Sequence, residues 1–301
     1  MLGGMRCETT SDAGEFWDVA GDFLCADPVV NSVIITNVLV RRRGEVTDSA
    51  PPTFLCVLDD TGSLVGAAMR TPPHAIAITA LPAAAIAPTV AALRETCRDA
   101  VGVWGAADSA KGFADEWSRQ TGQVAAMKMQ GRIHRLDSVR PPAPVAGAMR
   151  LATMDDVDLL ARWTRAFIRE AEEGMAPKVA AEEQEKATAD EAAAQQADAA
   201  MRIAEKRTYL WEHGEPVSFV RRSDCVAGAV RIGPVYTPPE RRGRGYASAL
   251  VAAVSQRALD EGAETCCLHT DLANPTSNKI YAAVGYRPVC DVTHYRFEPA
   301  G

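Results

Sequence analysis

Two spacings of apolar residues divide this chain into predicted strands and helices. Alternation at every second position is typical of a half-buried strand, and recurrence every three to four positions is typical of an amphipathic helix. Over residues 53–135 these spacings predict strand Thr53–Leu58, turn Asp59–Gly62, strand Ser63–Arg70, strand Ala75–Leu81, helix Ile86–Val101, strand Val101–Trp104, helix Ala110–Arg119 and strand Gln123–Arg135. The mixture of strands and helices indicates an α/β class.

The second half begins with a predicted strand at Ala148–Leu151 and a helix that starts at Thr153 and extends to Glu172. Gly174 and Pro177 are expected to end that helix. The next stretch, Val179–Glu205, is rich in Ala, Glu and Gln and is predicted to form one or two helices. Its acidic run is expected to be a solvated face rather than a site; the run comprises Glu182, Glu183, Glu185, Asp190 and Glu191.

An antiparallel meander is predicted to follow. Its strands are Thr208–Glu212, Val217–Arg221 and Val226–Tyr236, with turns at His213–Gly214 and Ser223–Asp224. The apolar spacing of Ser248–Leu259 then predicts a helix, and the apolar stretch Thr265–Leu268 predicts a further strand. These strands and helices can cover both faces of one sheet.

A proline-rich segment separates the two halves. Pro141, Pro142 and Pro144 favour an extended, semi-rigid linker. With 301 residues and 47% hydrophobic content, the chain is long enough for two domains. We therefore predict a first domain over residues 1–140, a linker over 141–147 and a second domain over 148–301.

Composition narrows the choice of partners and compartment. The net charge of -7 argues against a general nucleic-acid-binding surface, which requires a basic face. No apolar run approaches the roughly 18 residues of a membrane span, and no secretory signal is evident, so we expect a cytoplasmic protein without membrane association. The eight cysteines lack the spacing of a zinc site, so we expect reduced thiols and no metal.

The chain's most informative segment joins the predicted strand that ends at Tyr236 to the helix at Ser248–Leu259. It reads Arg242-Gly243-Arg244-Gly245-Tyr246-Ala247. Small residues let a ligand approach the backbone closely, and the first amides of the following helix favour an anion. This segment therefore predicts a pyrophosphate-binding loop. A second polar cluster follows the apolar strand Thr265–Leu268: Asn274, Ser277, Tyr281, Gly285 and Tyr286.

Together the two clusters resemble the GCN5-related N-acetyltransferase (GNAT) family. Arg242, Gly245 and Ala247 match the family's Arg/Gln-x-x-Gly-x-Gly/Ala motif, and Asn274, Ser277 and Tyr281 match its later polar positions in order. The resemblance covers roughly residues 148–299. It implies a GNAT fold, which is an α/β (α+β) fold with a mixed, mostly antiparallel central sheet flanked by helices. The family fold implies a parallel strand near Thr265–Thr270, a helix from about Pro275 to Val284, and final strands at Tyr286–Val289 and Val292–Phe297.

The predicted elements of the N-terminal half follow a similar order. We therefore expect a smaller α/β domain that is a degenerate GNAT-like repeat. Its counterpart of the glycine-rich loop, Pro82–Ala85, contains no glycine. Without such a loop we expect this half to act as a packing partner or substrate wall rather than to bind coenzyme A.

The resemblance also implies a donor substrate, acetyl-CoA, and a set of residues that bind it. The loop would hold the pyrophosphate, with Arg241 adding charge, while Val235 and Thr237 would bond the pantetheine amides. The full predicted set is Val235, Tyr236, Thr237, Arg242, Gly243, Arg244, Gly245, Tyr246, Ala247, Asn274 and Ser277. No metal is part of this chemistry.

For the reaction, the family implies direct transfer of an acetyl group to a neutral amine. Tyr281 occupies the position of the general acid that protonates the departing thiolate. The base is left open among Glu170, Glu172 and Asp271, because an alkylammonium must lose a proton before it attacks. His269 is a further candidate, although a lone histidine on a strand is more often a hydrogen-bonded core residue, and a water chain could replace any base.

The acceptor remains open on the sequence alone. We expect a small-molecule amine. The alternatives are a protein lysine or N-terminus, or a catalytically weak acyl-CoA-binding regulatory module. A homodimer is also left open.

Overall fold

The computed structural model describes residues 4–46, 48, 50–173 and 189–300. The side chains of residues 171–191 lie outside this description, as does the backbone of 174–188. The predicted helix break at Gly174 and Pro177, the start of the predicted Val179–Glu205 helix, and the acidic run of Glu182, Glu183 and Glu185 therefore fall outside the described residues. The chain divides into two compact units, which we describe separately.

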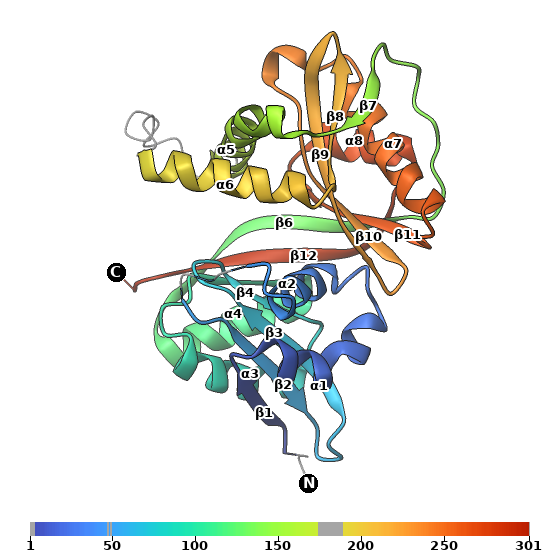
Figure 1. Ribbon diagram of the computed structural model, residues 1–301. Helices are drawn as coiled ribbons and strands as arrows, with labels where there is room; N and C mark the ends of the chain where they lie inside the picture. Colours follow the sequence, from blue (N-terminus) through green and yellow to red (C-terminus); the bar gives the residue numbers. More distant parts are fainter. Residues whose placement is uncertain (1–3, 47, 49, 174–188, 301) are drawn as a thin grey trace. The chain divides into compact units, whose positions relative to one another are not determined.

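Unit 1 comprises residues 1–134, 269–274 and 288–301. Its elements are β1 (Arg6–Thr10), α1 (Ala13–Cys25), α2 (Ser32–Arg42), β2 (Thr53–Leu58), β3 (Leu64–Arg70), β4 (Ile76–Ile78), α3 (Ala83–Thr96), β5 (Gly102–Ala106), α4 (Ala107–Thr121), β6 (Val124–Leu136) and most of β12 (Arg287–Glu298) (Figure 1). The strand order is β1-β2-β3-β4-β5-β12-β6. The last strand of the sequence thus completes the N-terminal sheet, where it pairs antiparallel with β5.

Unit 2 comprises residues 135–268 and 275–287. Its elements are β7 (Ala148–Leu151), the 3₁₀ turn η1 (Met154–Asp156), α5 (Val157–Glu173), α6 (Ala189–Ala204), β8 (Thr208–His213), β9 (Glu215–Val226), β10 (Ala229–Tyr236), η2 (Pro239–Arg241), α7 (Tyr246–Asp260), β11 (Thr265–Asp271, whose last three residues belong to unit 1) and α8 (Pro275–Val284). Its strand order is β11-β10-β9-β8-β7.

The two halves of the sequence follow one order of elements. In each half a strand is followed by two helices, three strands, a helix, a strand, a helix and a final strand. In each, the third strand of the meander pairs in parallel with the strand that follows the next helix: β4 with β5, and β10 with β11. The expected repeat is therefore confirmed, with a mixed, mostly antiparallel arrangement of strands.

Two hydrophobic cores cover the opposite faces of the unit 2 strands. On one face, α7 and α8 pack Leu250, Val251 and Val284 against β9, β10 and β11. On the other face, α5 and α6 pack Leu160 and Ala199 against β8, β9 and β10. Figure 1 shows these helix pairs on the two sides of β8 and β9. The two faces of the sheet therefore present different side chains to a ligand, one set from the α5/α6 core and the other from the α7/α8 core.

In unit 1, α3 and α4 cover one face through Val90, Leu93 and Phe113. On α1, Phe16 stacks on Phe54 of β2 with ring centroids 5.1 Å apart. Residues 4–52 carried no predicted element, yet they form β1, α1 and α2. Contacts with the sheet, such as that of Phe16 with Phe54, hold these elements in place. Such contacts cannot be read from a single sequence.

Three other predictions need correction. The strand that leads to Val226 has no turn at Ser223–Asp224; β9 continues to Val226 and the chain reverses at Ala227 and Gly228, both of which have positive φ. The final two predicted strands are one strand, β12. Helix α3 ends at Thr96, before Cys97, rather than at Val101. Among the described residues, no helix has the length and apolar character needed to cross a membrane.

Candidate active site

The pairing between β10 and β11 stops short of the strand ends. The two strands are in parallel register from Ala229 opposite Thr265 to Arg231 opposite Cys267, whereas β10 continues to Tyr236. Its register with β9 is irregular between Ile232 and Val235. Beyond Arg231, the β11 side of β10 therefore offers backbone groups to a ligand that binds like an added strand.

The loop before α7 has the backbone conformation expected of an anion-binding turn. Gly243 and Gly245 have φ values of +74° and +81°, which side chains with a Cβ rarely adopt. Gly245 is the N-cap of α7 and supplies no side-chain cap. The first amides of α7 are therefore left for another partner, at the positive end of the helix.

A second constraint acts on Gly245. A Cβ at this position would lie 2.9 Å from the side chain of Val145, in the proline-rich segment. That segment is held against unit 2 by the indole nitrogen of Trp211, which donates to the carbonyl of Ala146 at 3.0 Å. Glycine is thus required at position 245 by packing as well as by backbone conformation.

The arginines of the loop have different partners. Arg241 forms an ion pair with Glu215. Arg242 donates to the carbonyl of Thr237 at 2.8 Å and to Glu170 at 2.6 Å. The exposed Arg244 makes a contact of 3.5 Å with the carbonyl of Glu240 and, among the described residues, has no carboxylate partner. Arg244 is therefore the loop cation most available to a phosphate.

The end of β10 is fixed by buried hydroxyl groups that the sequence did not single out. Ser218 donates to the carbonyl of Tyr236, and Thr237 donates to the hydroxyl of Ser218, both at 2.9 Å. The ring of Tyr236 packs in the α5/α6 core, with the Arg242 guanidinium 5.8 Å from its centroid. These contacts give Val235, Tyr236 and Thr237 a rigid backbone. A buried serine facing a strand end leaves no signal in a single sequence.

Tyr281 lies on α8, where it is buried with 9% of its surface exposed. Its ring meets that of Tyr286 edge-on at 6.1 Å, and the Tyr286 hydroxyl bonds Ser255 at 2.8 Å. Burial raises the pKa of Tyr281 to about 12, so its hydroxyl keeps its proton at neutral pH. This is the state that a general acid needs before the reaction.

Glu170 lies near the end of α5 and contacts two of the predicted ligand-binding residues. Besides Arg242, its carboxylate accepts a long hydrogen bond of 3.4 Å from the hydroxyl of Tyr236. The structure thus brings Glu170 to the end of β10. The ring of Tyr281 contacts Tyr286, which is not one of the residues that bind Glu170. The side chain of Glu172, the neighbouring candidate, lies outside the described residues.

Asp271, Asn274 and His269 belong to unit 1, whereas Ser277 and Tyr281 belong to unit 2. Asp271 accepts from the amide of Ala273 at 2.8 Å, and its carbonyl accepts from the amide of Asn274 at 3.1 Å. Asp271 thus stabilises the turn that leads toward α8. His269 stacks on Trp104 at 5.5 Å and bonds the hydroxyl of Ser32 at 3.3 Å. Ser277 is half-buried in the first turn of α8.

The corresponding place in unit 1 is closed. A Cβ at Gly105 of β5 would lie 2.7 Å from the carbonyl of Ile78 at the end of β4, so these strands stay in contact there. The amide of Leu81 donates to Ser109 of α4 at 2.9 Å. Helix α3 then begins after Pro82, which has no amide hydrogen. The described residues of unit 1 thus have neither the strand opening nor the glycine-rich turn of unit 2.

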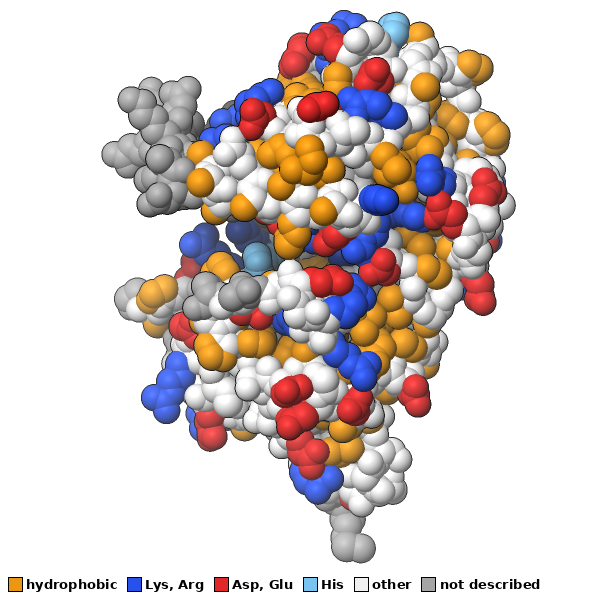
Figure 2. Space-filling view, viewed as in Figure 1, with side chains coloured by type: hydrophobic (Ala, Val, Ile, Leu, Met, Phe, Trp, Pro, Cys, Tyr) orange, Lys and Arg blue, Asp and Glu red, His pale blue; other side chains and the backbone are white. Residues whose placement is uncertain are grey.

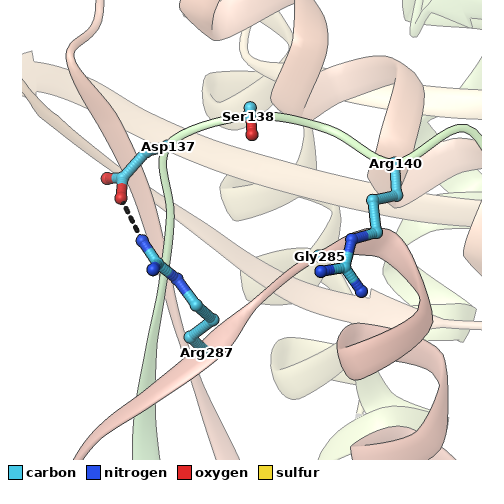
Figure 3. Close-up of a pocket in the computed structure, with 5 residues that line it drawn as sticks. All are labelled: Asp137, Ser138, Arg140, Gly285 and Arg287. Carbon is cyan, nitrogen blue, oxygen red and sulfur yellow. Dashed lines mark hydrogen bonds and ion pairs between the residues drawn. The ribbon is translucent and has the colours of Figure 1, made fainter.

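A cavity of about 180 Å³ in unit 2 is a separate feature. It is lined by Asp137, Ser138, Arg140, Gly285 and Arg287 (Figure 3). Asp137 bonds Arg287 at 2.6 Å across it and bonds Arg135 at the same distance. None of the predicted catalytic or ligand-binding residues is among the described residues that line it.

All eight cysteines are free thiols.

Comparisons with known proteins agree with this geometry. Residues 166–286 match the model of the acetyltransferase (GNAT) family. This segment includes the β10–β11 opening, the glycine-rich loop and Tyr281. Residues 166–286 therefore form a GNAT acetyltransferase domain within the chain. No curated protein matches the chain.

Solved structures resemble the whole chain. A GCN5-related N-acetyltransferase from Sphaerobacter thermophilus is 15% identical with a TM-score of 0.58, over 99% of this chain and 96% of that one. A tandem GNAT protein from the clavulanic acid biosynthesis pathway is 15% identical with a TM-score of 0.57, over 99% of both chains. A GNAT-family acetyltransferase from Colwellia psychrerythraea is 11% identical with a TM-score of 0.55, over 97% of this chain and 100% of that one. These identities establish a shared fold alone, and that fold extends over both halves.

Proposed function

We propose that the protein transfers the acetyl group of acetyl-CoA to the primary amine of a small molecule. The observation that carries this proposal is the end of β10–β11 pairing at Arg231 and Cys267, next to a helix whose N-cap is Gly245. An extended pantetheine arm needs unpaired strand groups, and a pyrophosphate needs uncapped helix amides. Unit 2 supplies the two features in consecutive elements.

In this proposal the amides from Gly243 to Ala247 bind the pyrophosphate, and Arg244 adds a positive charge. The backbone of Val235 to Thr237 pairs with the pantetheine amides. The hydrogen bonds of Ser218 hold that backbone in place before the ligand arrives, which lowers the entropic cost of binding. Asn274 and Ser277 are proposed to bond the arm of the coenzyme.

The amine nitrogen attacks the thioester carbonyl, and collapse of the tetrahedral intermediate releases the thiolate. We assign Tyr281 as the acid that protonates the sulfur, because its raised pKa keeps the proton on the hydroxyl until a thiolate appears. Glu170 is our first choice for the base that removes the amine proton. Its carboxylate already lies at the end of β10, within reach of the Tyr236 hydroxyl. Asp271 is the second choice.

Residues 1–140 are proposed to be an accessory domain without acetyl-CoA, linked through residues 141–147 to the transferase domain over 148–301. The closed contact between Ile78 and Gly105 supports this division of roles.

The test is a thiol-release assay with acetyl-CoA and pools of small amines and peptides, run on the wild type and on Tyr281→Phe. Acceptor-dependent release that falls in the variant would support the transferase and its acid. Failure of the folded protein to bind millimolar acetyl-CoA in calorimetry would overturn the proposal.

A further inference from the structure

Arg221 of β9 stands directly across from the irregular part of β10. Ile232 is in register with Arg222 and Val235 with Val220, so Gly233 and Pro234 together oppose Arg221. This bulge begins two residues after Arg231, the last residue that pairs with β11. The backbone of Arg221 therefore lies one strand spacing, about 4.8 Å, from the β10 residues whose other edge is no longer paired with β11.

The side chain of Arg221 projects to the α5/α6 face. Residues two apart on a strand share a face, and Phe219 belongs to the α5/α6 core. The guanidinium carbon of Arg221 lies 5.7 Å from the centre of the Phe219 ring, and Nη2 lies 3.3 Å from the hydroxyl of Thr164 on α5. The next residue, Arg222, faces the other way, toward Tyr209 and Glu261.

The positive charge of Arg221 has no carboxylate of its own among the described residues. Asp198 is 3.8 Å from Nη1 and also accepts from Arg202 at 3.2 Å. Glu205 is shared between Arg202 and Arg207. The Nε atom of Arg221 is buried and has no hydrogen-bond partner in the described structure, and only 13% of the side chain is exposed. Burial and the neighbouring Arg202 lower its pKa.

A buried guanidinium with an unpaired N–H lowers the stability of the fold unless an anion accepts its remaining hydrogen bonds. Its Nε–H and Nη2–H lie on one edge, and that edge matches the two oxygens of a carboxylate. On the α7/α8 face the neighbouring arginine, Arg222, already has the carboxylate of Glu261 as its partner, and Leu250 and Leu268 there are buried and apolar. An acceptor that carries both an amine and a carboxylate can pair its carboxylate with this edge while its amine points toward the β10 bulge opposite Arg221.

We propose that the acceptor is an amino acid and that Arg221 binds its carboxylate while the amine faces the thioester. This inference rests on the proposed acetyl transfer and adds the substrate class. Arg221 then determines specificity without taking part in bond formation.

The experiment compares free amino acids with their carboxamides as acceptors for the full-length protein, at equal concentrations of neutral amine. For the wild type, kcat/KM is expected to be about 10- to 100-fold higher for the acid than for the amide, the range for a hydrogen bond to a charged group. Arg221→Gln is expected to remove this difference and Arg221→Lys to keep part of it. Arg222→Gln, on the opposite face of the same strand, should preserve the difference.

Equal wild-type rates for acid and amide would overturn the inference without any variant, and so would an unchanged preference in a folded Arg221→Gln. Calorimetry with acetyl-CoA separates this failure from that of the proposed function. A protein that transfers acetyl to amines without regard to the carboxylate refutes only the role of Arg221. One that binds no acetyl-CoA and acetylates no amine refutes both proposals.

Discussion

The guanidinium of Arg242 lies 2.6 Å from the carboxylate of Glu170, so one ion pair joins α5 to the loop before α7. Both side chains are partly exposed, and such a pair contributes at most about 1 kcal/mol. Its importance is chemical, because it couples a candidate base to a candidate phosphate ligand. Figure 2 shows Lys and Arg side chains interspersed with Asp and Glu over the visible face, so local pairs of this kind shape the electrostatics.

Replacing Glu170 by Gln should separate these two roles. Acetyl-CoA is expected to bind about twofold to fivefold more tightly, because Arg242 is released toward the phosphates. Turnover should fall at least about tenfold, because the base is lost. Calorimetry and steady-state rates measure the two effects. Glu215→Gln is the matched control: it releases Arg241 in the same loop and should leave turnover unchanged. Unchanged turnover in Glu170→Gln would move the base to another residue.

Tyr281→Phe should reduce kcat by about 100-fold while acetyl-CoA affinity is kept. A general acid works only while protonated, and the pKa of about 12 keeps Tyr281 protonated up to about pH 10. The wild-type rate should therefore rise with pH as the amine deprotonates, without an alkaline decline up to that pH. The control is Tyr286→Phe, which removes a hydroxyl bonded to Ser255 and should lower stability by about 1 kcal/mol without affecting turnover.

Gly245→Ala should weaken acetyl-CoA binding about tenfold and destabilise the protein by about 2–3 kcal/mol. The added Cβ is strained at a φ of +81° and also meets Val145 at 2.9 Å. Gly243→Ala has similar backbone strain at +74° but no neighbour within 4 Å, so about 1 kcal/mol is expected. Chemical denaturation gives the comparison. Equal losses in the two variants would show that contact with Val145 is unimportant.

Phe297→Ala should destabilise unit 1 by about 3–5 kcal/mol. The ring is 6% exposed and stacks on Trp117 with centroids 4.7 Å apart, although it comes from the far end of the sequence. Arg296→Ala, an exposed neighbour on the same strand, should cost less than about 0.5 kcal/mol. A fragment of residues 1–140 lacks β12 and is expected to be unfolded by circular dichroism. A cooperatively folded fragment would contradict this role for β12.

Acetyl-CoA should bind with a stoichiometry of one per chain. The Ile78–Gly105 contact and the Leu81–Ser109 hydrogen bond occupy the place in unit 1 that is open in unit 2. Calorimetric titration measures the number of sites directly. Two saturable sites of similar affinity would show that unit 1 opens to admit a second molecule.

The pattern of residues predicted secondary structure correctly wherever contacts within one segment determine that structure. Helix α7 extends over Tyr246–Asp260, close to the Ser248–Leu259 that its apolar spacing predicts, and the strand and glycine turn before it follow from the sequence of that segment. The turn after β9 was misplaced because Ser223 and Asp224 are common turn residues, whereas Ala227 and Gly228 adopt the positive φ values. The Ser223 hydroxyl instead accepts from the amide of Arg231 across the strands.

By itself the sequence indicated a GNAT domain in the second half, the repeat of elements, the glycine-rich loop and Tyr281 and Glu170 as candidate catalytic residues. Only the tertiary structure decided that β12 completes the N-terminal unit, that Glu170 pairs with Arg242, and that Arg221 faces the β10 bulge. The physical reason is range. Backbone conformation and periodic burial are set by neighbours in sequence, whereas ion pairs and strand exchange join residues tens to hundreds of positions apart, for which one sequence holds no record of proximity.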